Sequence, residues 1–479
     1  MTGCGSLRAV WRCVSMWCVL SAMTVAPAPG AVRWPQFRGE NCSGVADGDK
    51  PPVEFGPSTR LLWKTPLPRG LSSPCIWEDR IFVTAFDGRK LETICLRRSD
   101  GRILWRQQAP AEKIERVSGY NSPASATCAT DGRFVYAYFG ASCGLVAYDF
   151  DGNRAWHTPL PIYNVRHGSA ASPILAAGRL IINGDQEDGK SFIAAIDPAT
   201  GRILWQTPRP MYLSSQTTPV YWKRGDVEEV VIAGCVRLTA YDVRDGAERW
   251  SVRGLEAISI ANSPVVGGDM LFAMSQSMGE DKLPPFAALA AQYDRNGDGR
   301  ISPAESPRMV RDIFSVLDVN RDGAITADEY DQRLRILGQA DYGLLAVRAP
   351  DRSGDLTDTH IVWRQKKGIS EVSSPLYYRG RLFIIRDGGL ASCFEARTGR
   401  PLYQLERIGA EGRYYASPVA ADGRIYVASM SGVVTVIEAG DTLKVLARND
   451  LGEAIAATCA IADNKLYIRT ASAMWAFGE

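Results

Sequence analysis

Residues 172–205 read SPILAAGRLIINGDQEDGKSFIAAIDPATGRILW, and this stretch decides the fold. A Ser-Pro pair opens a short apolar run, and a Gly-Arg turn leads into a second run that ends at Ile182. A third run ends at Asp197, and a Gly turn then precedes a last strand that ends at Trp205. Short apolar runs bounded by Gly, Pro and Asp are typical of β-strands joined by turns. The stretch therefore predicts one antiparallel unit of four strands.

The same unit recurs along the chain. Its opening pair is Ser-Pro, Thr-Pro or a degenerate Thr-Cys, and the openings lie at Ser73-Pro74, Ser122-Pro123, Ser172-Pro173, Thr218-Pro219, Ser263-Pro264, Ser374-Pro375, Ser417-Pro418 and Thr458-Cys459. Successive openings are 49, 50, 46, 45, 111, 43 and 41 residues apart, and one four-stranded propeller blade needs about 40–45 residues. Eight openings predict an all-β fold, an eight-bladed β-propeller. The step of 111 predicts an insertion within the fifth blade.

The two ends of the chain have complementary defects. A Trp-containing strand, residues 61–66, precedes the first opening, whereas the last unit stops at Phe477 after only three strands. If the N-terminal strand completes the last blade, two open sheet edges disappear together. A closed ring explains both defects, and a linear array of repeats does not.

The repeat resembles a known family. Gly101–Trp105 and Gly201–Trp205 both read GRILW, which is similar to the pyrroloquinoline-quinone-type (PQQ-like) β-propeller repeat. The resemblance covers about residues 61–281 and 345–479, and Trp34–Gly39 (WPQFRG) resembles the start of exported members. The family includes quinoprotein dehydrogenases as well as non-enzymatic propellers such as the outer-membrane assembly lipoprotein. The resemblance therefore implies a fold but no single activity.

The N-terminus has the layout of a signal peptide. Arg8 and Arg12 precede an apolar run over residues 14–25, and small residues and prolines follow. A non-cleaved anchor is the alternative, although the run is short for a membrane span. We expect export to the periplasm or secretion. The expected division is a signal peptide 1–31, an N-terminal segment 32–60, first propeller part 61–281, insertion 282–340 and second propeller part 341–479.

Composition excludes several classes of protein. The 479 residues are 46% hydrophobic and 23% charged, which excludes a disordered chain. Fifty-five Lys and Arg against 53 Asp and Glu give a net charge of +2, so a globally basic nucleic-acid binder is not expected. Eight cysteines follow residue 31, and several lie in apolar runs, which favours buried thiols over disulfides.

The insertion contains two tandem EF-hand loops, residues 294–305 and 318–329. Ca²⁺ prefers six to eight oxygen ligands, which a twelve-residue loop supplies from positions 1, 3, 5, 7, 9 and 12. The first set is Asp294, Asn296, Asp298, the Arg300 carbonyl, Ser302 and Glu305. The second set is Asp318, Asn320, Asp322, the Ala324 carbonyl, Thr326 and Glu329. Calcium is thus the predicted metal, with a structural role favoured over sensing.

Apolar residues at helical spacing flank both loops, as expected for an EF-hand pair. Only residues 306–317 separate the loops, so a single helix of about 18 Å is expected to serve both. This short linker casts doubt on the usual face-to-face pairing of the loops.

Polar and aromatic residues precede the strand openings, and we expect these segments to gather at one mouth of the propeller channel. The candidates for a ligand site are Tyr120, Asn121, Arg166, His167, Tyr212, Gln216, Asn262, Glu371, Arg413, Tyr414 and Tyr415. A solvated rim without a ligand is the alternative. No catalytic motif emerges from the sequence.

Binding or scaffolding is the predicted function, with a protein or a polysaccharide as partner. The alternative that the resemblance implies is a PQQ-dependent oxidoreductase acting on alcohols or sugars. In that branch of the family an adjacent cysteine pair, a Trp platform and a Glu/Asn/Asp set hold PQQ and Ca²⁺, but this chain has no adjacent cysteines. A calcium-responsive adaptor is a third hypothesis.

Overall fold

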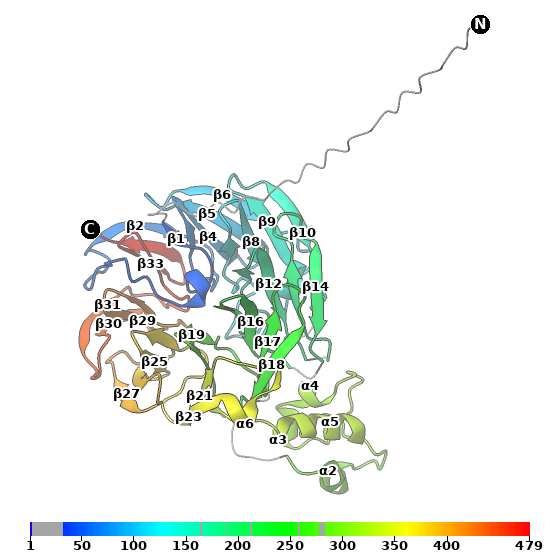
Figure 1. Ribbon diagram of the computed structural model, residues 1–479. Coiled ribbons are helices and arrows are strands. Elements are labelled where there is room, and N and C mark those ends of the chain that lie inside the picture. The colour runs from blue at the N-terminus through cyan, green and yellow to red at the C-terminus, as the bar shows by residue number, and fades with distance from the viewer. Residues whose placement is uncertain (2–31, 163–164, 188, 211–212, 257–258, 277–282) are drawn as a thin grey trace. The chain divides into compact units, whose positions relative to one another are not determined.

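The computed structural model describes residue 1 and residues 32–162, 165–187, 189–210, 213–256, 259–276 and 283–479. The predicted signal peptide, apart from Met1, lies outside these residues. Residues Val32–Glu479 form one compact unit. In this unit eight mainly antiparallel sheets surround a channel (Figure 1), which confirms the predicted eight-bladed propeller.

Blades 1 to 4 each contain four consecutive strands. Blade 1 has β3 (Cys75–Trp77), β4 (Arg80–Phe86), β5 (Leu91–Arg97) and β6 (Ile103–Gln108). Blade 2 has β7 (Ala129–Thr130), β8 (Phe134–Tyr138), β9 (Leu145–Asp149) and β10 (Arg154–Thr158). Blade 3 has β11 (Ile174–Ala176), β12 (Arg179–Gly184), β13 (Phe192–Ile196) and β14 (Ile203–Pro208). Blade 4 has β15 (Val220–Arg224), β16 (Val227–Ala233), β17 (Arg237–Asp242) and β18 (Glu248–Arg253).

Blades 5 to 8 follow the same order, except that blade 8 takes its outer strand from the N-terminus. Blade 5 has β19 (Val265–Gly267), β20 (Met270–Ser275), β21 (Gly343–Arg348) and β23 (Ile361–Gln365). Blade 6 has β24 (Leu376–Tyr378), β25 (Arg381–Arg386), β26 (Leu390–Glu395) and β27 (Pro401–Arg407). Blade 7 has β28 (Val419–Ala421), β29 (Arg424–Ala428), β30 (Val433–Glu438) and β31 (Val445–Asp450). Blade 8 has β32 (Ala460–Ala462), β33 (Lys465–Arg469), β34 (Ala473–Phe477) and β2 (Leu61–Pro66).

The N-terminal strand closes the ring as predicted. Strand β2 pairs antiparallel with β34, from Leu61 opposite Phe477 to Pro66 opposite Ala473. Two short strands extend other sheets: β1 (Arg33–Trp34) pairs with β3, and β22 (Gly354–Asp355) pairs in parallel with β18. The remaining short elements are η1 (Glu40–Cys42), α1 (Gly140–Cys143) and α6 (Thr357–His360).

A belt of Ser and Thr side chains joins neighbouring blades around the channel. In seven successive steps the backbone N–H of one belt residue donates to the hydroxyl of the next, over 2.9–3.0 Å. The belt residues are Ser73, Thr127, Ser172, Thr218, Ser263, Ser374, Ser417 and Thr458. All eight are buried, so the bonds satisfy amides that water does not reach.

The belt corrects one predicted opening. In blade 2 the belt residue is Thr127, followed by Cys128, and not Ser122 with Pro123. Ser122 lies in the preceding loop, where its hydroxyl accepts from the Ala124 amide. Blade 2 therefore opens with a Thr-Cys pair, as blade 8 does at Thr458.

Tryptophans on the outer strands dock on the next blade. The indole Nε1 of Trp156 donates to the Pro198 carbonyl over 2.9 Å, and the ring covers Gly201. Trp63, Trp105, Trp205 and Trp363 make the equivalent bonds. Trp250 is the exception to this hydrogen bond, because its Nε1 donates to Glu229 of its own sheet, although it lies in a buried cluster with Leu271 and Val347 of blade 5.

The N-terminal segment spans one end of the channel, which the sequence did not reveal. The Pro35 carbonyl accepts the Thr130 amide of blade 2, and Gln36 Oε1 accepts the Leu175 amide of blade 3. Arg38 is fully buried, and its Nη2 donates to the Pro375 carbonyl beside blade 6 over 2.8 Å. Contacts with blades on opposite sides of the ring make this segment a floor across the channel.

Replacing the glycine beneath a docked tryptophan should weaken the ring. At Gly201 (φ +75°) an added Cβ would lie 2.6 Å from the Trp156 ring, whereas at Gly178 (φ +73°) it would meet nothing within 4 Å. Both substitutions to Ala pay the cost of a left-handed backbone, about 1 kcal/mol. We expect Gly201→Ala to lower the free energy of unfolding by at least about 1 kcal/mol more than Gly178→Ala in denaturant titrations. Equal losses would contradict this account of tryptophan docking.

Candidate functional site: the channel mouth and the EF-hand pair

A cavity of about 460 Å³ opens at the end of the channel away from the N-terminal floor. Phe37 of that floor lies at its base, and all eight belt residues line its wall. Seven of the predicted mouth residues line it as well: Tyr120, Asn121, His167, Gln216, Glu371, Arg413 and Tyr415. The sequence analysis missed Ser125, Ser259 and Asp387, which also line the cavity. We call this cavity and its lining the channel mouth.

The other predicted mouth residues lie elsewhere. Arg166 points to the insertion, where its Nη2 donates to the Asp312 carbonyl over 2.6 Å. Asn262 is 1% exposed and donates from Nδ2 to the Glu371 carbonyl, which makes it a buried support. Tyr414 is also buried, and its hydroxyl donates to the Ala410 carbonyl. Tyr212 lies outside the described residues.

Two loops meet across the rim of the mouth. The guanidinium of Arg413, which precedes blade 7, lies 4.9 Å from the ring centroid of Tyr120, which precedes blade 2. Its Nη1 also donates to the Tyr415 hydroxyl over 3.0 Å, and this bond raises the pKa of Arg413 above its ordinary value. Tyr120 is 58% exposed. The rim therefore presents a cation between two aromatic rings.

Deeper groups in the mouth are neutral or engaged with the protein. Burial, aided by the charge of Arg166, lowers the pKa of His167, so this imidazole is neutral at pH 7. Asp387 Oδ1 accepts the Tyr414 amide over 2.7 Å. Each belt hydroxyl that accepts an amide can still donate its own proton to a bound molecule. Such a lining suits a polar ligand.

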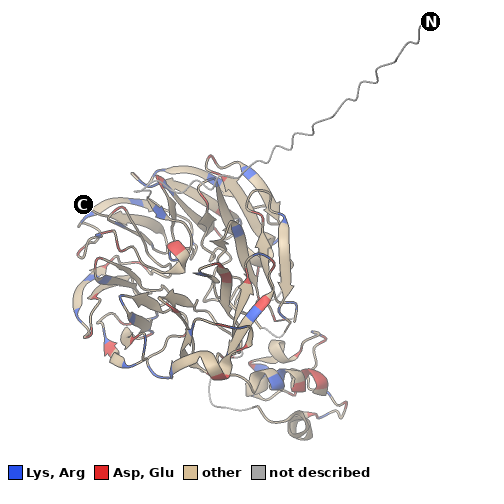
Figure 2. Cartoon of the chain, viewed as in Figure 1, with Lys and Arg blue, Asp and Glu red and all other residues tan. Residues whose placement is uncertain are grey.

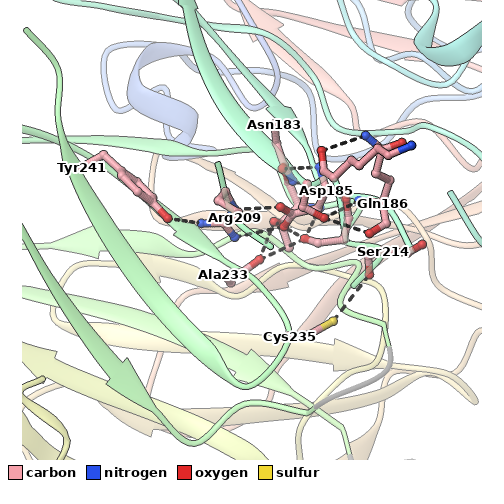
Figure 3. Close-up of polar contacts among 12 residues, drawn as sticks. Asn183, Asp185, Gln186, Arg209, Ser214, Ala233, Cys235 and Tyr241 are labelled. Atoms are coloured by element: carbon pink, nitrogen blue, oxygen red, sulfur yellow. Dashed lines mark hydrogen bonds and ion pairs between the residues drawn. The ribbon is translucent and has the colours of Figure 1, made fainter. Parts of the chain in front are cut away.

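A buried ion pair within blade 3 also contacts blade 4 (Figure 3). Arg209 donates from Nε and Nη2 to the two oxygens of Asp185, over 2.7 and 3.0 Å, and from Nη1 to the Tyr241 hydroxyl over 2.6 Å. Both charged side chains are fully buried. Losing one partner of such a pair costs about 3–5 kcal/mol, so the loop that begins at Asp185 is firmly held.

The insertion between β20 and β21 folds as an EF-hand pair. Its helices are α2 (Phe286–Tyr293), α3 (Arg308–Arg311), α4 (Phe314–Leu317) and α5 (Ala327–Leu337). The two loops do pair face to face, since Ile301 and Ile325 exchange two backbone bonds of 2.9 and 2.8 Å. The expected single linker helix is wrong: α3 and α4 are separate, with a non-helical backbone at Ile313 between them. The observed pairing of Ile301 with Ile325 removes the doubt about loop pairing.

The residues of the second loop fit a cation. Asp318, at position 1, is 6% exposed, and its Oδ1 is buried without a hydrogen-bond partner among the described residues. Such an oxygen is costly unless a cation or a donor reaches it. Glu329, at position 12, accepts from the Thr326 hydroxyl and amide, and bonds to backbone and hydroxyl groups lower its pKa despite its partial burial. It is therefore ionised at neutral pH, as a calcium ligand must be.

Some loop carboxylates are engaged with other groups in this structure. Asp322, at position 5 of the second loop, is ion-paired with Arg300 of the first loop. The described residues contain no group of three or more His, Cys, Asp or Glu side chains arranged to hold a metal. An EF-hand also draws on amide, hydroxyl and carbonyl oxygens. A calcium ion in the second loop would compete with Arg300 for Asp322.

Charge is otherwise mixed over the surface of the unit. Figure 2 shows Lys and Arg interspersed with Asp and Glu over the blades, and α5 carries both signs. No helix among the described residues is both long and apolar enough to cross a membrane.

The fold and the insertion define the class: a PQQ-type repeat propeller that carries an EF-hand pair. The model of the family described as outer membrane protein assembly factor BamB matches residues 53–163, 124–298 and 346–472. The chain belongs to this family. A model of the EF hand matches residues 310–334, which include the second loop.

Solved structures share the fold at low sequence identity. BamB from Moraxella catarrhalis is 15% identical with a TM-score of 0.54, over 88% of this chain and 97% of that chain. The quinohemoprotein alcohol dehydrogenase from Comamonas testosteroni is 11% identical with a TM-score of 0.56, and the match covers 93% of this chain and 81% of that chain. A europium-containing methanol dehydrogenase is 11% identical with a TM-score of 0.54, and the match covers 93% of this chain and 91% of that chain. A search of curated protein sequences found no match.

The lining of the mouth does not fit the way in which, by the resemblance, a quinoprotein would hold PQQ. The lining residues include neither a tryptophan nor a cysteine, and their carboxylates are Glu371 and Asp387. All eight cysteines of the described chain are buried free thiols, and burial raises the pKa of Cys128, beside the belt, to about 12. The Trp platform and the adjacent cysteine pair of a quinoprotein thus lack counterparts among these residues, whereas Glu371, Asp387 and Asn121 supply the residue types of its Glu/Asn/Asp set.

Calcium binding at each loop of the insertion should depend on a single carboxylate. We expect calorimetric titration of residues 32–479 to give two calcium ions per chain. Asp318→Ala should remove the second site, and Asp294→Ala together with Asp318→Ala should remove both, because position 1 is a direct ligand. Asp331→Ala, an exposed carboxylate on α5 outside the loops, is the control. Unchanged binding in the double variant would show that the ions bind elsewhere.

Proposed function

We propose that the protein is an exported, calcium-binding propeller that acts as a binding or scaffold protein. A protein or a polysaccharide is its partner, and a protruding part of that partner enters the channel mouth. The observation that carries the proposal is the one-ended channel: a cavity of about 460 Å³, within the range of ligand sites, over the floor at Phe37. The family description as an outer membrane assembly factor supports a protein partner and a place in the cell envelope.

The chemistry of the lining supports binding rather than turnover. Polar groups from many blades converge there, and several of them are held by hydrogen bonds within the protein, as Asp387 and Arg413 are. Exposed aromatic rings beside a cation are common in recognition surfaces.

Site-specific photocrosslinking tests the proposal. A photoreactive phenylalanine derivative at position 120 should crosslink the partner in the cell envelope, and mass spectrometry of the adduct should reveal a peptide or a glycan. The same group at Thr442, an exposed residue in the turn between β30 and β31, faces the other end of the channel and should give no such adduct. Adducts only at position 442 would overturn the proposed site.

A titration with PQQ separates binding from the oxidoreductase alternative. With the EF-hand loops saturated with calcium, we expect no heat of PQQ binding and no dye-linked oxidation of alcohols or sugars. Saturable binding of one PQQ per chain that survives Asp294→Ala plus Asp318→Ala would place a cofactor in the channel and contradict the scaffold function.

A further inference from the structure

We infer that the EF-hand pair forms one lip of the channel mouth, so that calcium binding to the insertion orders mouth loops and strengthens ligand binding there. The inference rests on the proposed function, because it assigns a regulation to the same site. Three sets of contacts carry it. Each joins the insertion, which leaves the ring at blade 5, to loops of blades 3 and 4.

The first contact is a shared hydrophobic core. Leu213, in the loop before blade 4, and Cys235, in the turn after β16, are buried in one cluster with the EF-hand residues. That cluster includes Ile301 and Ile325, the two residues that pair the calcium loops. A change in the packing of the loops therefore reaches Leu213 directly, and Gln216 of the mouth lies three residues further along the same loop.

The second contact is a buried arginine on α5. Arg333 is 2% exposed; its Nε donates to the Val316 carbonyl over 3.0 Å and its Nη2 to the Glu187 carbonyl over 3.1 Å. Val316 lies two residues before Asp318, the first ligand of the second calcium loop. Glu187 lies two residues after Asp185, whose amide donates to Asn183 Oδ1, and Asn183 in turn donates to the Ser215 and Thr217 carbonyls on either side of Gln216 of the mouth. Arg333 thus connects both helices that flank an EF-hand loop to a loop that is bonded to the segment around Gln216.

The third contact comes from Arg166, the residue before His167 of the mouth. Arg166 donates from Nη2 to the Asp312 carbonyl in the linker between the calcium loops, and its backbone N–H donates to Ser214 Oγ over 2.8 Å. The next residue, His167, lines the cavity. One short segment therefore contacts the insertion on one side and any bound ligand on the other.

Calcium has a defined structural effect to transmit through these contacts. Occupying the second loop gathers Asp318 and Glu329 around one ion and takes Asp322 from Arg300 of the first loop. This stiffens α4 and α5 relative to each other, and Arg333 links these two helices. Because linkage is reciprocal, a ligand in the mouth must raise calcium affinity by the same factor, commonly about 5–150-fold.

Hydrogen exchange with calcium as the probe tests the inference. On the mature full-length protein, calcium should slow amide exchange in residues 165–173 and 213–218 by about five-fold or more, as well as within the insertion. Distant mouth segments such as residues 413–417 serve as the internal reference and should change less. Protection confined to residues 283–340 would overturn the inference.

Variants that cut the connection separate this inference from the proposed function. Arg333→Met should leave calcium binding measurable by calorimetry but abolish the protection of residues 165–173, whereas Arg335→Met, an exposed residue of the same helix, should change neither. Arg166→Gln removes the contact with Asp312 together with the charge beside His167 and Glu187, and it provides a second test if Arg333→Met unfolds. If the wild-type protein does not bind calcium, the proposed function is contradicted. If calcium binds but amide exchange in the mouth loops does not slow, only the inference is contradicted.

Discussion

The belt of hydroxyl-to-amide hydrogen bonds is the constraint on which the rest of the structure depends. Eight sheets surround one axis, and seven bonds of 2.9–3.0 Å fix neighbouring blades relative to each other at seven of the eight junctions. Because the amides are buried, a blade that shifted would leave them without partners. The belt also brings the preceding loops to one end of the channel, which creates the mouth.

The floor spans one end of the channel, so the two ends differ. Residues 34–44 bond to blades on both sides of the ring, and Phe37 of this segment lies at the base of the cavity. A ligand therefore enters only from the mouth, past the rim of Tyr120 and Arg413. On the same side the EF-hand pair rests on loops of blades 3 and 4 through Leu213 and Arg333. The propeller and the insertion together form the binding face that we propose.

Much of the fold was predictable from sequence, because the repeat carries local signals at every turn. The blade count, ring closure by β2 and the twelve-residue calcium loops follow from Ser-Pro openings, GRILW strands and oxygen ligands at fixed spacing. Blade 2 was misplaced at Ser122 because its true opening, Thr127-Cys128, has no proline to mark it.

The candidate site was only partly predictable, because tertiary contacts decide the direction of side chains in long loops. Arg166 follows the loop pattern of the mouth, yet the insertion 146 residues away in sequence supplies its acceptor. Asn262 precedes a strand opening but is buried beneath Glu371. The floor carries the WPQFRG motif, but its position was not predictable, because its bonds go to backbone groups of distant blades. Helical periodicity in the linker between the EF-hand loops also did not show that this linker forms two separate helices, α3 and α4.

The central claim is that a calcium-filled insertion and the propeller loops form one binding face, and a crystal structure grown in millimolar calcium tests it most directly. The account predicts one ion in each loop, Asp322 released from Arg300, and Arg333 still bonded to Glu187 beside an open mouth. Empty loops, or an insertion detached from blades 3 and 4, would contradict it.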